Sequence, residues 1–148
     1  MRDFSISVDI AATPERVWQV LIDAERWHEW TPSVTSVELL DESMAVGSRA
    51  IIQQPELPPA KFRITGLEPG KSFTWSTGIP GIVLVSARHV VDPAPLGARV
   101  TLAVRFGGLL GGVMGRKYAD LNHRYLAMEA AGLKRFSEEG PRDPNAPR

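Results

Sequence analysis

The sequence predicts an α+β fold in which a seven-stranded antiparallel sheet curves around one long C-terminal helix, with two short helices between its first two strands. Three patterns predict this class. An alternating apolar and polar segment opens the chain, six short strand-like segments follow residue 32, and a segment of about six turns with helical periodicity comes last. A sheet with one apolar face must cover it, and only the last helix is long enough.

The N-terminal segment justifies the first strand and the first helix. Residues 4–10 alternate apolar and polar side chains, as expected of a strand with one buried face. Thr13 and Pro14 supply an N-cap and a proline at the first helical position, where its missing N–H costs nothing. A second short helix or turn is expected over residues 23–30, ended by Pro32. The apolar stripe of the first helix is Val17, Trp18, Val20 and Leu21.

Six further strands are separated by Gly and Pro turn residues, which implies an antiparallel meander. They cover residues 34–40, 48–54, 60–67, 71–77, 82–91 and 98–106. The glycine-rich segment 107–117 lacks the spacing of a phosphate loop, so we expect a flexible apolar hinge. The long helix then begins near Val113. Its expected inward face is Met114, Tyr118, Leu121, Tyr125, Met128 and Gly132, where the glycine predicts close packing against the sheet or the first helix.

Composition limits the function classes. The 148 residues suffice for one core, and 17 basic residues balance 17 acidic residues, so no net charge favours nucleic acid. The absence of cysteine excludes disulfides and thiolate metal sites, and the histidines lack metal-ligand spacing. No signal peptide or membrane span is recognisable. We therefore expect a soluble cytoplasmic protein without metal, cofactor or stable membrane insertion, as a monomer or homodimer.

The element order and several motifs carry a family resemblance. The motifs are the Pro14, Val17-Trp18, Trp27, Trp30 and Pro32 pattern, the Gln54-Pro55 step, the Phe73-Thr74-Trp75 strand and the Glu129–Leu133 helix segment. Over about residues 3–136 the chain resembles the START-like helix-grip superfamily, specifically its polyketide cyclase/dehydrase-like SRPBCC branch. The resemblance implies a ligand-binding domain over residues 1–137 with a deep apolar cavity between sheet and long helix, and a disordered tail over 138–148. In such a fold the glycine-rich hinge would gate the cavity mouth.

Aromatic and polar side chains on inward faces are the candidate ligand-binding residues. Strand alternation turns Phe62, Phe73 and Trp75 toward the concave face, although ordinary core packing would look the same. Trp27 and Trp30 are the candidate wall residues of the short helical segment, whereas Trp18 is expected in the core. The remaining candidates are Tyr118 and Tyr125 on the long helix, and Gln54, which the resemblance favours over Gln53.

His89 is the candidate for proton transfer. Alternation places it on the more apolar face of its strand, where it could orient a ligand or, together with Tyr125, act as an acid or base. Three functions follow. The leading one is binding of a small hydrophobic molecule of the lipid, polyketide or aromatic type, and the alternative is a polyketide cyclase or dehydratase that uses these two residues. A protein-interaction module would need an exposed apolar patch, which the balanced charges do not indicate.

Overall fold

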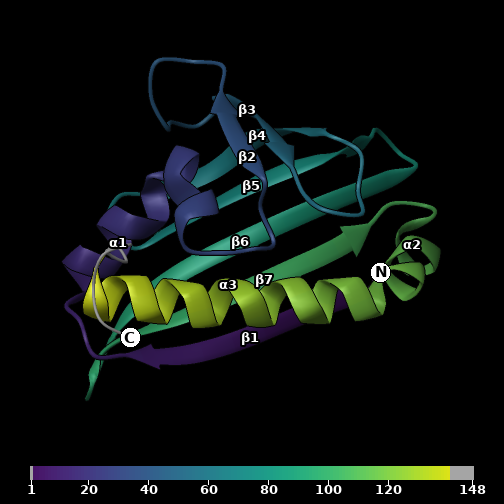
Figure 1. The fold of residues 1–148 in the computed structure, drawn as a ribbon. Coiled ribbons are helices and arrows are strands. Elements are labelled where there is room, and N and C mark those ends of the chain that lie inside the picture. The colour runs from purple at the N-terminus through teal and green to yellow at the C-terminus, as the bar shows by residue number, and fades with distance from the viewer. Residues whose placement is uncertain (1, 141–148) are drawn as a thin grey trace.

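The structure is a computed structural model that describes residues 2–140, and it confirms the predicted α+β fold (Figure 1). The elements are β1 (Arg2–Ile10), α1 (Pro14–Ile22), the 3-10 helix η1 (Ala24–Glu29), β2 (Ser36–Leu39), β3 (Arg49–Gln53), β4 (Ala60–Glu68), β5 (Ser72–Ile79), β6 (Val83–Ala94), β7 (Gly97–Gly107), α2 (Gly111–Lys117) and α3 (Ala119–Glu139). They form a seven-stranded sheet with the order β1-β7-β6-β5-β4-β3-β2 and antiparallel pairing throughout. Each predicted strand is present.

The strand faces follow from side-chain alternation. In β6, His89 is buried and Ala87 is partly buried, while Arg88 between them is exposed. The neighbouring strand continues this face, because Phe73 of β5 pairs with His89 in the register of the sheet. Successive side chains of a strand point to opposite faces, so the apolar residues of each strand line the concave side.

The start of α1 confirms the predicted cap. Thr13 is in an extended conformation and its hydroxyl accepts a hydrogen bond from the Arg16 backbone N–H at 3.1 Å, while Pro14 occupies the first turn. Trp18 packs edge-on against Phe73, with ring centroids 6.3 Å apart. Trp18 is therefore a packing residue that fastens α1 to the sheet, as the sequence predicts.

The C-terminal helix differs from its prediction in two ways. The expected single helix is divided at Tyr118, whose φ of −101° and ψ of 15° lie outside the helical range. The segment expected to be a flexible hinge is helical from Gly111 onward. Gly111 and Gly115 are buried there, because an added Cβ would lie 2.8 Å from the Phe106 carbonyl oxygen and 2.7 Å from the Arg2 side chain, respectively. These glycines serve close packing rather than mobility.

Gly132 has the packing role that the sequence predicts, but with a different partner. An added Cβ at this position would lie 1.9 Å from the backbone carbonyl oxygen of Trp30. The helix therefore touches the residue that ends η1, rather than the sheet or α1. Because only a residue without Cβ permits this approach, Gly132 sets the position of Trp30 over α3.

The helix α3 lies over one side of the sheet. It packs mainly against β1, with fewer contacts to α1 and β7, and the segment around η1 approaches the other side over β2 (Figure 1). The buried face of α3 includes Leu126, Ala130, Leu133 and Phe136, whereas Met128 of the expected stripe is only partly buried. This off-centre position leaves space beside α3 over the concave face of the central strands.

The helix α3 extends beyond the predicted end of the domain at residue 137. α3 continues to Glu139, so residues 138 and 139 belong to the helix rather than to the predicted tail. Gly140 is the C-cap of this helix, and residues 141–148 of the predicted tail lie outside the described residues. Among residues 2–140, no helix is long and apolar enough to cross a membrane.

Candidate functional site

A cavity of about 280 Å³ lies between the central strands and the helices α2 and α3. Its volume is close to the lower end of the roughly 300–1,000 Å³ that small-molecule sites usually occupy. The floor is formed by inward residues of β3 to β7, and the connection between β3 and β4 covers one side. The cavity is therefore a product of the curved sheet and of the off-centre helix.

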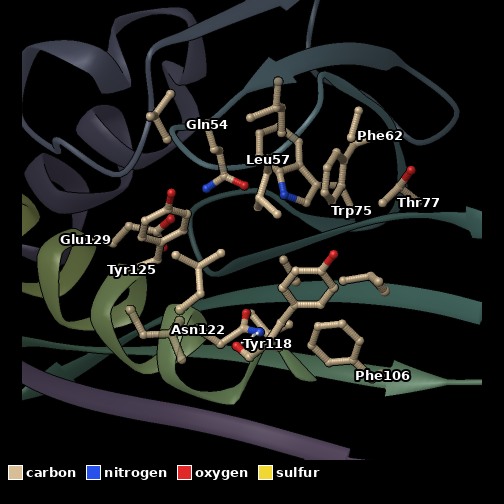
Figure 2. A pocket seen from close by; sticks show the side chains of 18 of the residues that line it. Gln54, Leu57, Phe62, Trp75, Thr77, Phe106, Tyr118, Asn122, Tyr125 and Glu129 are labelled. Carbon is tan, nitrogen blue, oxygen red and sulfur yellow. Dashed lines mark hydrogen bonds between the residues drawn. The ribbon is translucent and has the colours of Figure 1, made fainter. Parts of the chain in front are cut away.

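Most of the cavity wall is apolar. β6 contributes Val83, Val85 and Ala87, which are successive inward residues of one strand, and aromatic rings stand on both sides of them. Figure 2 shows Phe62 and Trp75 on one side and Phe106 with Tyr118 on the other. Such a wall favours a ligand with an aromatic or aliphatic body.

Seven of the nine candidate ligand-binding residues line the cavity, and two do not. The seven are Trp27, Gln54, Phe62, Trp75, His89, Tyr118 and Tyr125. Phe73 is fully buried beneath His89, with the two rings stacked at 4.1 Å and an interplanar angle of 11°. Trp30 lies behind Trp27, with centroids 5.7 Å apart. These two residues support the wall without reaching its surface.

Trp27 is the centre of the aromatic cluster. Its indole N–H donates to the Leu21 carbonyl oxygen at 2.9 Å, which ties η1 to α1. Its ring contacts Trp75 at 5.1 Å and His89 at 5.4 Å. Buried aromatic pairs at such distances contribute about 0.5–1.5 kcal/mol beyond the area that they bury. Trp27 thus holds the short helical segment against the wall that it helps to form.

His89 is a neutral side chain in this environment. Burial lowers its pKa to about 4, and a hydrogen bond to the Phe73 carbonyl oxygen only partly opposes this shift. The Nδ1 atom lies 3.2 Å from that oxygen, so Nδ1 carries the proton and Nε2 is an acceptor. A histidine with so low a pKa is a weak base at neutral pH.

Tyr125 and Gln54 fasten the connection between β3 and β4. The Tyr125 hydroxyl donates to the Pro55 carbonyl oxygen, and burial, reinforced by Glu56, raises the pKa of this phenol. The Gln54 amide nitrogen donates to the Ser33 carbonyl oxygen at 3.2 Å. Gln54 lines the cavity, whereas Gln53 is exposed. Both cavity residues therefore have one atom engaged with the backbone, and the Tyr125 proton is not free for transfer.

Glu129 is a cavity residue to which sequence reasoning assigned no role. It follows Tyr125 by one helical turn, so both face the cavity from α3 (Figure 2). Burial raises the pKa of its carboxyl group to about 7, while a hydrogen bond from the Ser33 hydroxyl opposes the rise. The Ser33 hydroxyl in turn lies 2.7 Å from that of Thr31. Because Tyr125 was expected to face inward, the spacing of four residues could have indicated that Glu129 faces the cavity as well.

Asn122 is a second cavity residue to which sequence reasoning assigned no role. It lies one turn before Leu126 on α3 and lines the cavity, and its amide nitrogen donates to the Tyr118 carbonyl oxygen at 2.9 Å. This bond spans the break between α2 and α3. The Tyr118 hydroxyl, by contrast, has no hydrogen-bond partner within residues 2–140, and it stands free toward the cavity in Figure 2.

An exposed apolar surface, here called the apolar tip, adjoins the cavity. Its members are Ile79, Ile82, Leu84, Leu109, Leu110 and Val113. The Leu110 N–H donates to the Ile82 carbonyl oxygen at 2.7 Å, which joins the turn between β5 and β6 to the segment before α2. Val83 and Met114, next to members of the tip in sequence, line the cavity. The sequence did not indicate this patch, because overall charge carries no information on local clustering.

A curved antiparallel sheet, a long C-terminal helix and an apolar cavity between them define the helix-grip class of proteins. A model of the family described as polyketide cyclase / dehydrase and lipid transport matches residues 1–138. The chain belongs to this family. No protein with a curated description matches the sequence.

Solved structures with the same fold include proteins of different kinds. The protein XoxI from Bacillus cereus has a TM-score of 0.73 and 18% identity, over 91% of this chain and 94% of that one. The di-domain ARO/CYC StfQ from the steffimycin biosynthetic pathway has a TM-score of 0.72 and 14% identity, over 93% of this chain and 50% of that one. Ara h 8.0201 has a TM-score of 0.65 and 12% identity, over 89% and 97%. At these identities the likeness shows the fold alone.

Proposed function

We propose that the protein binds a small hydrophobic molecule in the cavity of about 280 Å³. The observation that carries this proposal is the wall itself, in which aromatic and aliphatic side chains surround a volume that the core leaves unfilled. Protein interiors are normally close-packed, so an apolar space of this size has a cost in stability that ligand binding would offset. Membership of a family described by cyclases and lipid transport supports the same class of ligand.

The test fills the cavity from within. Ala87→Leu adds three carbon atoms to the inward face of β6, so we expect it to abolish the binding of a neutral apolar fluorescent probe such as N-phenyl-1-naphthylamine. The matched control is Ala103→Leu, because Ala103 pairs with Arg88 on the outer face of the neighbouring strand. Fluorescence titration measures both. Equal probe affinity in the two variants would contradict the proposal.

A cyclase or dehydratase is the second candidate, and Glu129 is the observation that favours it. A carboxyl group with a pKa of about 7 can both release and accept a proton at neutral pH, which suits proton transfer next to a ligand carbonyl. Among the described cavity residues, His89 is neutral with a low pKa and Tyr125 is bound to the backbone, so neither competes with Glu129 for this role.

Proton exchange tests the second candidate without a natural substrate. We expect the protein to accelerate deuterium uptake at the central carbon of benzoylacetone in D₂O, followed by NMR, and Glu129→Gln to remove this acceleration. His89→Gln should retain it, because His89 remains a poor base at neutral pH. An unchanged exchange rate in Glu129→Gln would exclude the carboxyl group as the acid or base.

A further inference from the structure

The polar atoms of the cavity are unevenly divided between donors and acceptors. The Gln54 and Asn122 amides each anchor their nitrogen on a backbone carbonyl oxygen, that of Ser33 and that of Tyr118. A carbonyl oxygen accepts only from the nitrogen side, so the orientation of each amide is settled. The side-chain carbonyl oxygens of Gln54 and Asn122 have no partner among the residues that the structure describes.

Most N–H and O–H groups of the ring side chains in the wall are likewise bonded to the backbone. Trp27, His89 and Tyr125 each direct their N–H or O–H to a backbone carbonyl oxygen. The His89 Nε2 atom is left as an acceptor, because a neutral imidazole carries only one proton. In the described part of the chain, the unpaired ring donors of the cavity wall are the Trp75 indole N–H and the Tyr118 hydroxyl. On the side of the cavity formed by Gln54, Tyr125 and Glu129, the free polar atoms are therefore acceptors.

In the described part of the chain, one carboxyl group lines the wall, and it has no cationic partner there. Glu129 lines the cavity, and within residues 2–140 no Lys, Arg or His nitrogen lies within 4.0 Å of its oxygens. Among the residues that the structure describes, no Lys or Arg lines the cavity. The nearby ion pair of Arg124 with Glu56, at 3.3 Å, is exposed and joins α3 to the connection between β3 and β4. A carboxylate in such an apolar site is costly unless a positive charge joins it.

We propose that this cavity selects an apolar ligand carrying a protonated amine, which pairs with Glu129 and donates to the free amide oxygen of Gln54. The proposal rests on the cavity being the binding site, as proposed above. An ammonium group has three N–H donors and no acceptor, which complements a carboxyl group beside unpaired carbonyl oxygens. Figure 2 shows Gln54, Tyr125 and Glu129 on one side of the cavity and Phe62 and Phe106 on the other, so the apolar body has its own place.

The aromatic wall adds to the selection. Trp27, Trp75 and the two tyrosines surround the same space, and ring faces attract cations as well as apolar groups. A fatty acid has the opposite charge to the one this site accommodates, because its carboxylate would meet Glu129 in a medium of low polarity. We therefore expect the cavity to bind amines in preference to carboxylates. An apolar wall without Glu129 would not distinguish between the two.

Amine binding should depend on pH through Glu129. The amine favours the carboxylate form, so affinity rises as the pH increases from 5.5 to 8, while an alkylamine with an ordinary pKa near ~10.4 stays protonated. The other titratable groups facing the cavity are His89 on β6, with a pKa of about 4, and Tyr118 and Tyr125 at the start of and within α3, which are phenols. From the segment after η1, the Ser33 hydroxyl faces Glu129 and is itself bonded to Thr31, and neither hydroxyl titrates in this range.

Three probes with one apolar body test the proposal by isothermal titration calorimetry at pH 8. They are 4-phenylbutylamine, 4-phenylbutan-1-ol and 4-phenylbutyrate. We expect the amine to bind about ten-fold or more tightly than the alcohol, and the carboxylate to bind weakest. Glu129→Gln should bring the amine to the affinity of the alcohol, leave the alcohol within about two-fold, and remove the pH dependence. The control is Glu139→Gln, which changes net charge equally at an exposed position of α3.

The outcomes separate this inference from the proposed function. If the alcohol binds and the amine binds no better, amine selection is wrong and the hydrophobic cavity remains a binding site. If an amine preference persists in Glu129→Gln, the assignment to Glu129 is wrong. If none of the three probes binds to the unmodified protein, the binding function itself is overturned.

Discussion

Replacing Glu129 with glutamine is expected to stabilise the protein more at high pH than at low pH. The difference in unfolding free energy between the variant and the unmodified protein should be roughly 3 kcal/mol larger above pH 7 than below pH 4.5. Burial raises the folded-state pKa of the carboxyl group to about 7, whereas the ordinary value is 4.5. Between these values the folded state retains a proton that the unfolded state has lost. Stability from this group is therefore full below pH 4.5 and is lost as the pH rises to 7, and glutamine has no such loss.

The comparison must be made between variants, because His89 has the opposite effect. Burial lowers its pKa from 6.5 to about 4, so the unfolded state binds the proton first and stability falls as the pH drops through this range. In the unmodified protein the two slopes nearly cancel between pH 4.5 and 6.5. Subtracting the unfolding free energies of protein and variant isolates the carboxyl group.

Urea denaturation at pH 4.5, 5.5, 6.5 and 7.5 measures the difference. Glu139→Gln is the matched control, since it removes an exposed carboxyl group from the same helix. A constant difference between Glu129→Gln and the unmodified protein across this series would show that the carboxyl group has an ordinary pKa.

Gly132→Ala is expected to destabilise the protein by roughly 2–3 kcal/mol, although alanine is the better helix former by about 1 kcal/mol. The added methyl group would lie 1.9 Å from the Trp30 carbonyl oxygen, and a backbone atom cannot rotate away. Either α3 or the end of η1 must shift. For a chain of this length the loss corresponds to a melting temperature lower by about 5–10 °C.

The control for this helix is Ala131→Gly, at the neighbouring exposed position. It reports helix propensity without the contact, and a loss of about 1 kcal/mol is expected. Thermal unfolding followed by circular dichroism compares the two. A melting temperature that is unchanged or raised in Gly132→Ala would mean that α3 and Trp30 do not touch in solution.

Sequence patterns were sufficient to predict the strands and their inward faces, but not which inward residues line the cavity. Alternation assigned Phe62, Trp75 and His89 to the inward face, because a strand side chain has only two directions. The same rule could not tell that Phe73 lies beneath His89 instead of beside the cavity. That distinction depends on which element covers each part of the sheet, and Phe73 is covered by Trp18 of α1 and Trp27 of η1.

Which residues of the helical segments line the cavity was harder to predict from the sequence. Trp27 and Trp30 are three residues apart, but only Trp27 lies within η1, so the chain has already changed direction at Trp30. Glu129 was assigned no role because a charged residue on a helix usually faces water. Its place on the inner face follows from the spacing to Tyr125, and its missing counter-charge is visible only in three dimensions.

The pairing of β1 with β7 also determines how the chain can fold. These strands come from opposite ends of the sequence, with Ile6 opposite Leu102, so their contact requires the closure of a long loop. The meander from β2 to β7 pairs neighbours and can form as each hairpin is completed. During synthesis the first strand must therefore wait until β7 has left the ribosome. The edge of β6 that will pair with β7 is open until then, and folding should be slow compared with that of helical proteins of similar length.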